Sequence, residues 1–409
     1  MLVVFLTVFI DLVGFGIVVP LVPIYSRDFG AGPWLGVIMA SFSAMQFVFA
    51  PIWGRLSDRH GRRPILLIST AGAAMSYVLF AIGSGLTNHN LALAVLVISR
   101  MFAGACGGNI TVAQAYIADI TPPENRSKRM GLIGMAFGLG FIFGPVISGI
   151  ALKFGNSSTP GWAAAVLCAA NFILAFCILT ESLKPDSGHV SGRPRFAQWA
   201  HTLGQPKIGL LILIFFLSTV AFSCFESTLA LLVNDDFKLG ITVDAAKPIT
   251  TVIWLFVFCG LISAFIQGGM IGRMVKLLGE PKLISFSLFL TGLALAWLPF
   301  IKGDGPLKWS AVFHFADVPW IKMLFALALL AIGSGLTRAP VFGLLSNLTP
   351  ANEQGATIGV AQSAGSLARI IGPLFAATLY VYAPSMPYVI CGGISILAGG
   401  LAAVRLSAK

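Results

Sequence analysis

The segment GRLSDRHGRRP, residues 54–64, joins two long apolar stretches at 33–54 and 64–85. The segment contains four arginines, one aspartate and two glycines, whereas neither flanking stretch contains a Lys, Arg, Asp or Glu. Each flanking stretch has about 20 residues, the length that an α-helix needs to cross the hydrocarbon core of a bilayer. The pattern predicts two membrane-spanning helices joined by a short charged loop at the membrane surface.

Composition extends this prediction to the whole chain. Of its 409 residues 57% are hydrophobic and 10% are charged, and the mean hydropathy is +0.91, whereas a soluble protein has about 25% charged residues. The net charge of +11 does not indicate a nucleic-acid partner, because the lysines and arginines lie between the apolar runs. All six cysteines lie inside apolar runs, without the paired spacing of a metal site or a disulfide framework. We therefore expect an all-α membrane protein without a metal site.

Twelve segments are long and apolar enough to span a membrane. The first starts at once, without a basic leader or a small-residue cleavage site, so it is expected to be retained. The polar stretch 182–206 contains prolines and is expected to be a cytoplasmic linker, extended or lying on the surface, between six-helix bundles at 1–181 and 207–409. The predicted spans are 2–25, 33–54, 64–85, 91–118, 129–152, 162–181, 207–233, 248–272, 282–301, 320–346, 356–381 and 386–405.

The positive charges predict the orientation of these spans. With the N-terminus inside, sixteen of the 26 lysines and arginines fall in inner loops and tails, seven fall outside, and three lie within spans. Basic residues concentrate on the cytoplasmic side of membrane proteins. We therefore expect a multi-pass protein of the cell (inner) membrane with both termini in the cytoplasm.

The two halves of the chain share paired motifs. Chance coincidence in a glycine-rich protein is the alternative, but the matches fall at equivalent helix ends. Two parallel repeats of six helices are typical of transporters in which one bundle rocks against the other. The pairs are Thr121-Pro122 with Thr349-Pro350, Gly131 with Gly359, Gly144-Pro145 with Gly372-Pro373 and, at a shorter offset, Gly54 with Gly272 and Gly61 with Gly279.

The charged loop at 54–64 suits a contact between helices. Gly54 permits close approach, Gly61 permits a tight turn, and Asp58 can reach a helix N-terminus, whose dipole favours a carboxylate. The segment resembles the cytoplasmic signature loop of the major facilitator superfamily, in particular that of its drug/proton antiporters. The resemblance implies that the loop locks the two halves together, although some of its basic residues can be explained by topology alone. The candidate lock residues are Gly54, Asp58, Arg59, Gly61, Arg62 and, as a partner for Arg62 or Arg129, Asp119.

The fifth predicted span contains GLIGMAFGLGFIFGPVISG, residues 131–149. At helical spacing most of its glycines fall on one narrow face, which predicts close packing against another helix. The segment resembles the Gly-Pro signature of the superfamily's antiporters, and generic small-residue packing is the alternative. The motif residues are Gly134, Gly138, Gly144, Pro145 and Gly149.

Charged residues inside spans are costly and therefore indicate function. Asp11 and Arg100 lie at similar depth in the first and fourth spans, and the resemblance places both helices at the central cavity, where the two residues are expected to face or pair. Glu226 is the only acid within the spans of the second half. We interpret these three as proton-coupling residues; a static ion pair is the alternative for Asp11 and Arg100, and a pore-mouth position for Glu226.

Other polar residues at membrane depth are candidates for substrate binding, although interhelical hydrogen bonds explain many such residues. An anionic substrate group or Glu226 could pair with Arg369, and either Arg338 or Arg369 could instead extend toward a helix end. The candidates are Gln46, Asn109, Gln114, Arg338, Gln362 and Arg369.

Together these features predict a secondary transporter that exports small amphiphilic compounds or drugs in exchange for protons, by alternating access. The resemblance covers nearly the whole chain and is nearest to the tetracycline/proton antiporter branch, although Ser76 stands where those exporters carry an aspartate. Proton-coupled import of a metabolite is the alternative, and a receptor or scaffold without transport is a lesser one. The expected partners are a small-molecule substrate and the bilayer, with a monomeric protein and no cofactor other than protons. No nucleophile–base set or phosphate loop indicates an enzyme.

Overall fold

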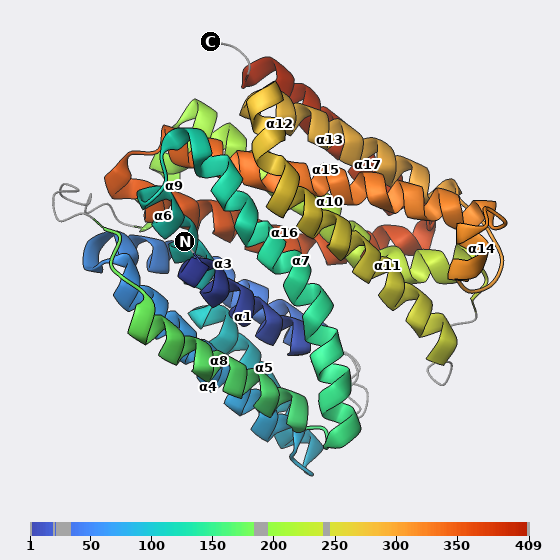
Figure 1. Cartoon of the computed structure of the whole chain (residues 1–409), viewed down its shortest axis with the longest axis horizontal. Coiled ribbons are helices and arrows are strands. Elements are labelled where there is room, and N and C mark those ends of the chain that lie inside the picture. Colours follow the sequence, from blue (N-terminus) through green and yellow to red (C-terminus); the bar gives the residue numbers. More distant parts are fainter. Residues whose placement is uncertain (1, 19–20, 22–33, 184–194, 240–245, 407–409) are drawn as a thin grey trace.

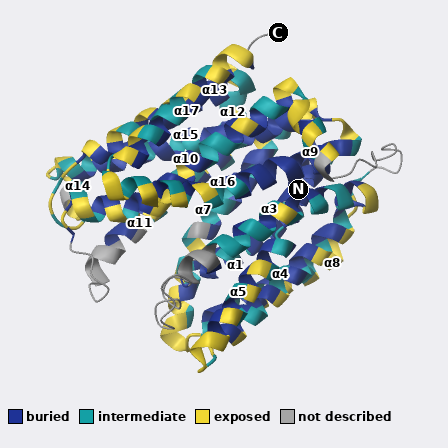
Figure 2. Cartoon of the chain, turned by 180° about the vertical axis from the view of Figure 1, so that it is seen from behind, coloured by how far each residue is buried: buried dark blue, intermediate teal, exposed yellow. Residues whose placement is uncertain are grey.

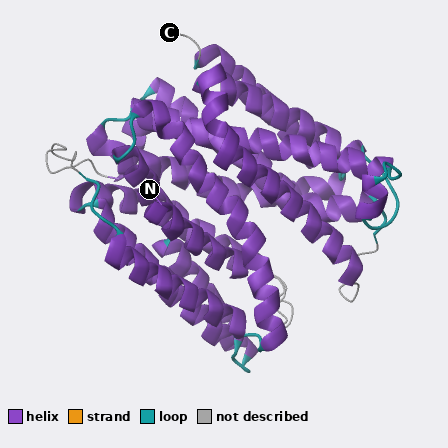
Figure 3. Cartoon of the chain, in the orientation of Figure 1, coloured by secondary structure: helices purple, strands orange, loops and turns teal. Residues whose placement is uncertain are grey.

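The computed structural model describes residues 2–18, 21, 34–183, 195–239 and 246–406, and the regular elements within these ranges are all helical (Figures 1 and 3). Ten helices among the described residues are long and apolar enough to cross a membrane, and the shorter helix at Val3–Val18 is also apolar. Lipid offers no hydrogen-bond partner to a backbone group, so each spanning segment satisfies its N–H and C=O groups internally. The prediction of an all-α membrane protein is confirmed.

The helices follow one another in the chain with short connections. They are α1 Leu2–Val18, α3 Trp34–His60, α4 Arg62–Ser84, α5 His89–Cys106, α6 Asn109–Asp119, α7 Pro123–Phe154, α8 Thr159–Ile178, α9 Arg195–Gly204, α10 Pro206–Asp236, α11 Ala246–Phe265, η1 Ile266–Met270, α12 Ile271–Leu278, α13 Glu280–Trp297, η2 Leu298–Phe300, α14 Trp309–Phe313, α15 Val318–Leu348, η3 Ala351–Glu353, α16 Gln354–Tyr382 and α17 Met386–Arg405.

Within the described residues, each of the twelve predicted spans overlaps a helix or consecutive helices; residues 19–20, 22–25 and 33 of the first two spans lie outside the described ranges. The span at 91–118 is interrupted at Gly107-Gly108, between α5 and α6, and the span at 248–272 contains η1, a π-helical turn between α11 and α12. Part of the predicted linker, 184–194, lies outside the described residues. The rest is not extended, because α9 forms a short helix that packs against α10 and α16.

The two halves of the chain form two sets of packed helices (Figure 1). In the first, α1 packs on α7 and α8, and α4 on α5 and α8; in the second, α10 packs on α16, and α13 on α15 and α17. The halves meet where α3 packs on α16 and where α7 packs on α11 and α15. We call the end of the molecule that carries Asp58 the Asp58 end. Toward the opposite end, α7 and α11 diverge (Figure 1).

Backbone conformation repeats between the halves at the paired motifs. Pro122 and Pro350, each just before the helix that follows, have the same φ of −57° and ψ of 148°. Gly61 and Gly279 precede α4 and α13 with φ of 95° and 72° and the same ψ of 157°. Positive φ values are readily accessible only to glycine. The pseudo-symmetry predicted from the sequence therefore extends to individual turns.

Large apolar side chains remain exposed on the outward faces of the helices (Figure 2). Examples are Ile173 and Phe176 of α8, Phe265 of α11, and Leu397 and Val404 of α17. A continuous apolar exterior is unfavourable in water and favourable in lipid. The chain is accordingly a multi-pass membrane protein.

Candidate functional site: a contact between the halves and the charged side chains inside the bundles

The last turn of α3 brings Asp58 to the first turn of α16. Its carboxylate accepts hydrogen bonds from the backbone N–H groups of Gly355, at 2.9 Å, and Ala356, at 2.8 Å. One turn earlier, a Cβ atom on Gly54 would collide with the carbonyl oxygen of Gly355. The first N–H groups of a helix have no intrahelical partner, and the helix dipole favours a carboxylate there. Asp58 therefore joins the halves through backbone atoms of α16.

Arg62, whose side chain is completely buried, connects this carboxylate to a second one. Its Nη1 donates to Asp58 Oδ1 at 2.5 Å and to Ser57 Oγ at 2.7 Å, and its Nε donates to Asp119 Oδ2 at 2.9 Å. The planar guanidinium group can serve two carboxylates at once. Asp119 thus pairs with Arg62, whereas Arg59 is exposed and has no ion pair with the described acids. We call Asp58, Arg62, Asp119 and the first turn of α16 the Asp58 contact.

Sequence reasoning missed Glu181, which lies beside the Asp58 contact. Its carboxylate accepts hydrogen bonds from the backbone N–H groups of Arg62, at 2.8 Å, and Arg63, at 3.1 Å. These groups belong to the start of α4, where the N-cap residue is Gly61 and supplies no side-chain acceptor. A helix that starts after glycine needs a hydrogen-bond acceptor from another part of the chain for its first backbone N–H groups. This requirement was the feature of the sequence that could have indicated a capping acid.

A second set of bonds joins α7 to the other half at the Asp58 end. Arg126 Nη1 donates to the carbonyl oxygen of Ser346 at 2.9 Å, and Asn347 Nδ2 donates to the carbonyl oxygen of Pro123 at 3.3 Å. A Cβ atom on Gly343 would collide with the side chain of Ser127. The halves are therefore in close contact at this end along both α3 and α7.

Asp11 lies buried in α1 among amide donors. Its carboxylate accepts a hydrogen bond from Asn171 Nδ2 of α8 at 2.9 Å and another from Asn109 Nδ2 of α6. Asn171 Nδ2 also donates to the carbonyl oxygen of Thr7 at 2.8 Å, which orients the amide. One acidic side chain therefore links three helices of the first half.

Arg100 does not form the expected pair with Asp11. It is 2% exposed, and its guanidinium carbon lies 5.6 to 5.9 Å from the ring centres of Phe42, Tyr77 and Phe80. Its Nε and Nη2 have no hydrogen-bond partner among the described residues. The aromatic faces stabilise the cation, while the two amides satisfy Asp11, so each charge is held separately.

The glycines of α7 pack against two different helices. A Cβ atom on Gly134 or Gly138 would collide with Gln267 or Gly260 of the other half, and one on Gly144 would collide with Gly16 of α1. A Cβ atom on Gly149 would meet nothing within 4 Å among the described residues, and Gly149 is exposed. Within that part of the chain, the assignment of Gly149 to a close helix contact is therefore wrong.

Most of the predicted substrate residues already bond across the interface between the halves. Gln362 Nε2 donates to Gln114 Oε1 at 2.7 Å. Gln46 Oε1 accepts from Ser366 Oγ and from Arg369 Nη2, each at 2.9 Å. Asn109 binds Asp11 as described above. Interhelical hydrogen bonding is thus the observed arrangement for these amides.

Glu226, Arg338 and Arg369 lie in the second half. The Glu226 side chain is exposed and the two arginines are half-buried. Arg369 interacts electrostatically with both Glu226 and Arg338. The guanidinium carbon of Arg338 lies 4.6 Å from the ring centre of Phe137, so this arginine reaches the boundary with the first half.

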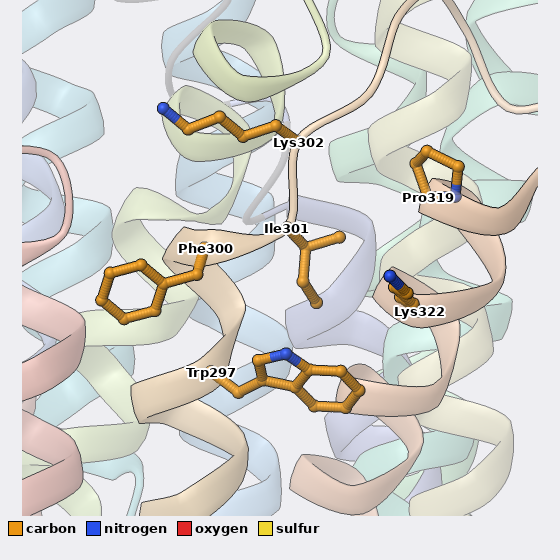
Figure 4. A pocket seen from close by; sticks show the side chains of 6 residues that line it. All are labelled: Trp297, Phe300, Ile301, Lys302, Pro319 and Lys322. Atoms are coloured by element: carbon orange, nitrogen blue, oxygen red, sulfur yellow. The ribbon is translucent and has the colours of Figure 1, made fainter.

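A pocket of about 280 Å³ at the end opposite Asp58 is separate from these groups (Figure 4). It lies between the end of α13 and the start of α15, and Trp297, Phe300, Lys302 and Lys322 contribute to its walls. Trp297 and Phe300 are partly exposed. Aromatic and lysine side chains are common at the membrane–water interface, so this pocket is not our candidate transport site.

The fold, the paired halves and the Asp58 contact define a class of protein. The Major Facilitator Superfamily sequence model matches residues 4–316 and 270–409, and the chain belongs to this family of transporters. Tetracycline resistance protein, class E, of Escherichia coli is 32% identical over 91% of this chain and 86% of that protein. Major facilitator superfamily domain-containing protein 10 of Bos taurus is 30% identical over 88% of this chain and 76% of that protein. The crystal structure of the human organic anion transporter MFSD10 (TETRAN) matches with a TM-score of 0.81 at 24% identity, covering 98% of each chain.

Proposed function

We propose that this transporter is a proton-coupled antiporter that exports small amphiphilic compounds across the inner membrane by alternating access. The observation that carries the proposal is the combination of Asp11, a buried acid inside the first half, with the Asp58 contact, which joins the two halves at one end of the molecule. We assign the Asp58 end to the cytoplasm, as the basic residues predict. In this state the path would be closed to the cytoplasm and the opposite end would release the compound.

Asp11 is the proposed proton carrier. As a carboxylate it accepts hydrogen bonds from the amides of Asn109 and Asn171. A protonated carboxyl group must donate its own proton, so at least one amide would have to rotate or move away. Because those amides belong to α6 and α8, protonation of Asp11 would alter the packing of three helices. This provides a physical link between the proton and the rocking motion.

The driving force is sufficient for export. One proton that enters releases roughly 2.3 kcal/mol per 100 mV of membrane potential and roughly 1.4 kcal/mol per pH unit. At 100 mV and one pH unit the sum sustains a concentration gradient of a few hundredfold for an uncharged compound. The tetracycline resistance relative supports a small organic compound as the cargo.

The direction of proton flow tests the proposal. Proteoliposomes that contain the pH-sensitive dye pyranine should become alkaline inside when a transported compound is added outside, because the compound enters and protons leave. Asp11→Asn should abolish this signal, whereas Asp304→Asn, a change at an exposed surface acid, should preserve it. Internal acidification would indicate symport and would refute the proposal. The absence of a pH change with every member of a panel of tetracyclines, cationic dyes and organic acids would show that these compounds are not exchanged for protons, and would also refute it.

A further inference from the structure

Three charged side chains of the second half take no part in the Asp58 contact: Arg338 on α15, Arg369 on α16 and Glu226 on α10. We propose that Arg338 and Arg369 bind an anionic group of the transported compound, such as a carboxylate or a sulfonate. We further propose that Glu226 is the internal anion that this group replaces at Arg369. The inference rests on the proposed transport function and adds the class of substrate to it.

The positions of the three side chains suit a site between the halves. Arg369 donates to Gln46 of α3, and the Arg338 guanidinium lies over the ring of Phe137 of α7, so both arginines touch the first half. An α-helix rises about 1.5 Å per residue. Counted from the Asp58 ends of their helices, the three residues lie at successive depths, in the order Arg338, Arg369 and Glu226, over roughly 15 Å. Glu226 is exposed, and because a charge this deep in a membrane is stable toward water rather than lipid, we infer that it faces the space between the halves.

Charge balance favours an anion at this site. Arg369 interacts electrostatically with one carboxylate, Glu226, and with one like charge, Arg338. Arg338 interacts with Arg369, a like charge, and forms no ion pair with a described acid, so one of the two positive charges is left without a counter-charge among the described residues. Uncompensated charge inside a membrane protein is unfavourable, and a bound anion would neutralise the remaining positive charge.

Arg338 has unused hydrogen-bonding capacity. Its Nε and Nη2 have no hydrogen-bond partner within the part of the chain that the structure describes. Its guanidinium carbon lies 4.6 Å from the ring centre of Phe137 and 5.8 Å from that of Phe215. The two nitrogen atoms are buried as well as unpartnered, and they belong to the edge of the guanidinium, which is the part that binds carboxylates and sulfonates. The same rings offer an apolar surface to the rest of an amphiphile.

Arg100 also has unpartnered nitrogen atoms, but it does not fit this role. It is 2% exposed and lies among three aromatic rings. Arg338 and Arg369 are half-buried as whole residues, although the free nitrogen atoms of Arg338 are buried, and the exposed Glu226 interacts electrostatically with Arg369. Access and charge together therefore point to the second half as the place that holds the substrate's anionic group.

Three probes with one fluorophore test the inference: dansylglycine is an anion, dansylamide is neutral and dansylcadaverine is a cation. Energy transfer from the tryptophans of the purified full-length protein to the dansyl group reports binding. We expect dansylglycine to bind about tenfold more tightly than dansylamide, the effect of one charge-assisted pair worth about 1.4 kcal/mol. Equal binding of the three probes, preference for the cation, or no binding of dansylglycine would overturn the inference.

Variants locate the effect. Arg369→Gln and Arg338→Gln should each reduce the preference for dansylglycine to about threefold or less, and Arg369→Lys, which keeps the charge, should retain part of it. Glu226→Gln should tighten dansylglycine binding, because it removes the competing internal anion. Lys322→Gln, at the separate pocket, should change nothing. Unchanged binding in both arginine-to-glutamine variants refutes the site.

Binding and transport can fail independently. If dansylglycine binds as expected but causes no pH change in the pyranine vesicles, the anion site stands and the antiport proposal fails. If the dansyl compounds are transported without preference for the anion, the antiport proposal stands and the anion site fails.

Discussion

Replacing Asp58 with asparagine should open the Asp58 end of the molecule. The substitution keeps one oxygen that can accept a backbone N–H, but it removes the charge that stabilises the start of α16. That charge contributes about 0.3–1 kcal/mol at a helix N-terminus. The variant also removes one of the two carboxylates that Arg62 serves. The ion pair between Asp58 and Arg62 lies within the first half and is lost in the open and the closed arrangement alike. What the closed arrangement alone loses is one of the two hydrogen bonds from α16 to the carboxylate, worth about 1.5–3 kcal/mol for a bond to a charged group.

The closed arrangement should therefore lose about 2–4 kcal/mol, which shifts the ratio of closed to open molecules by about 30- to 1,000-fold. Electron–electron double resonance between spin labels at His60→Cys and Ala351→Cys, with the native cysteines replaced, reports the distance across this end. We expect a single short distance for the parent and a longer, broader distribution for Asp58→Asn. An unchanged distribution, or the same broadening in Asp304→Asn at the opposite end, would refute the reasoning.

Three further results are expected. Gly144→Val should lower the melting temperature by several degrees, because overpacking costs about 1–3 kcal/mol. Gly149→Ala should not, because a Cβ atom there meets none of the described residues within 4 Å. Equal effects of the two substitutions would contradict the close packing of Gly144. Asn171→Ala should reduce proton-coupled transport about tenfold or more, because it removes from Asp11 a hydrogen-bond donor worth about 1.5–3 kcal/mol. Substrate binding should stay within about threefold of the parent. Probe titration measures binding and pyranine flux measures transport, and equal losses of the two would indicate a structural role instead. Glu181→Gln should lower the melting temperature by a few degrees, because α4 loses a capping carboxylate worth about 1 kcal/mol; unchanged stability would contradict the capping role.

The spans and the pseudo-symmetric halves could be predicted because they depend on local properties of the sequence. Lipid selects continuous apolar stretches of fixed length, so each predicted span overlaps one helix or consecutive helices in its described residues. Turns that need a positive φ could also be predicted from the local sequence, because glycine adopts such values readily. Gly61 and Gly279 have positive φ values, as expected. The break between α5 and α6 was not predicted, because His89–Asp119 as a whole is long and apolar enough to be taken for one continuous span.

Pairing between distant residues was harder to predict. The sequence identified Asp58, Arg62 and Asp119 but left the partner of Asp119 open between two arginines. Glu181 is the last residue of the sixth predicted span, and only its hydrogen bonds to the start of α4 reveal its role. Arg100 illustrates the opposite case. Similar depth and the family resemblance suggested that it faces or pairs with Asp11, whereas aromatic rings surround Arg100 and two amides bind Asp11.

The two hydrogen bonds from the start of α16 to Asp58 also bear on the timing of the transport cycle. Hydrogen bonds weaken steeply as their atoms separate and lose alignment, so most of their energy is lost within the first small displacement of one half from the other. The contact should therefore break in an all-or-none manner, with a barrier that lies close to the closed geometry. Changes at Asp58 would then accelerate opening far more than they would slow reclosure, so this carboxylate would set the dwell time of the closed state together with the bonds of Arg126 and Asn347.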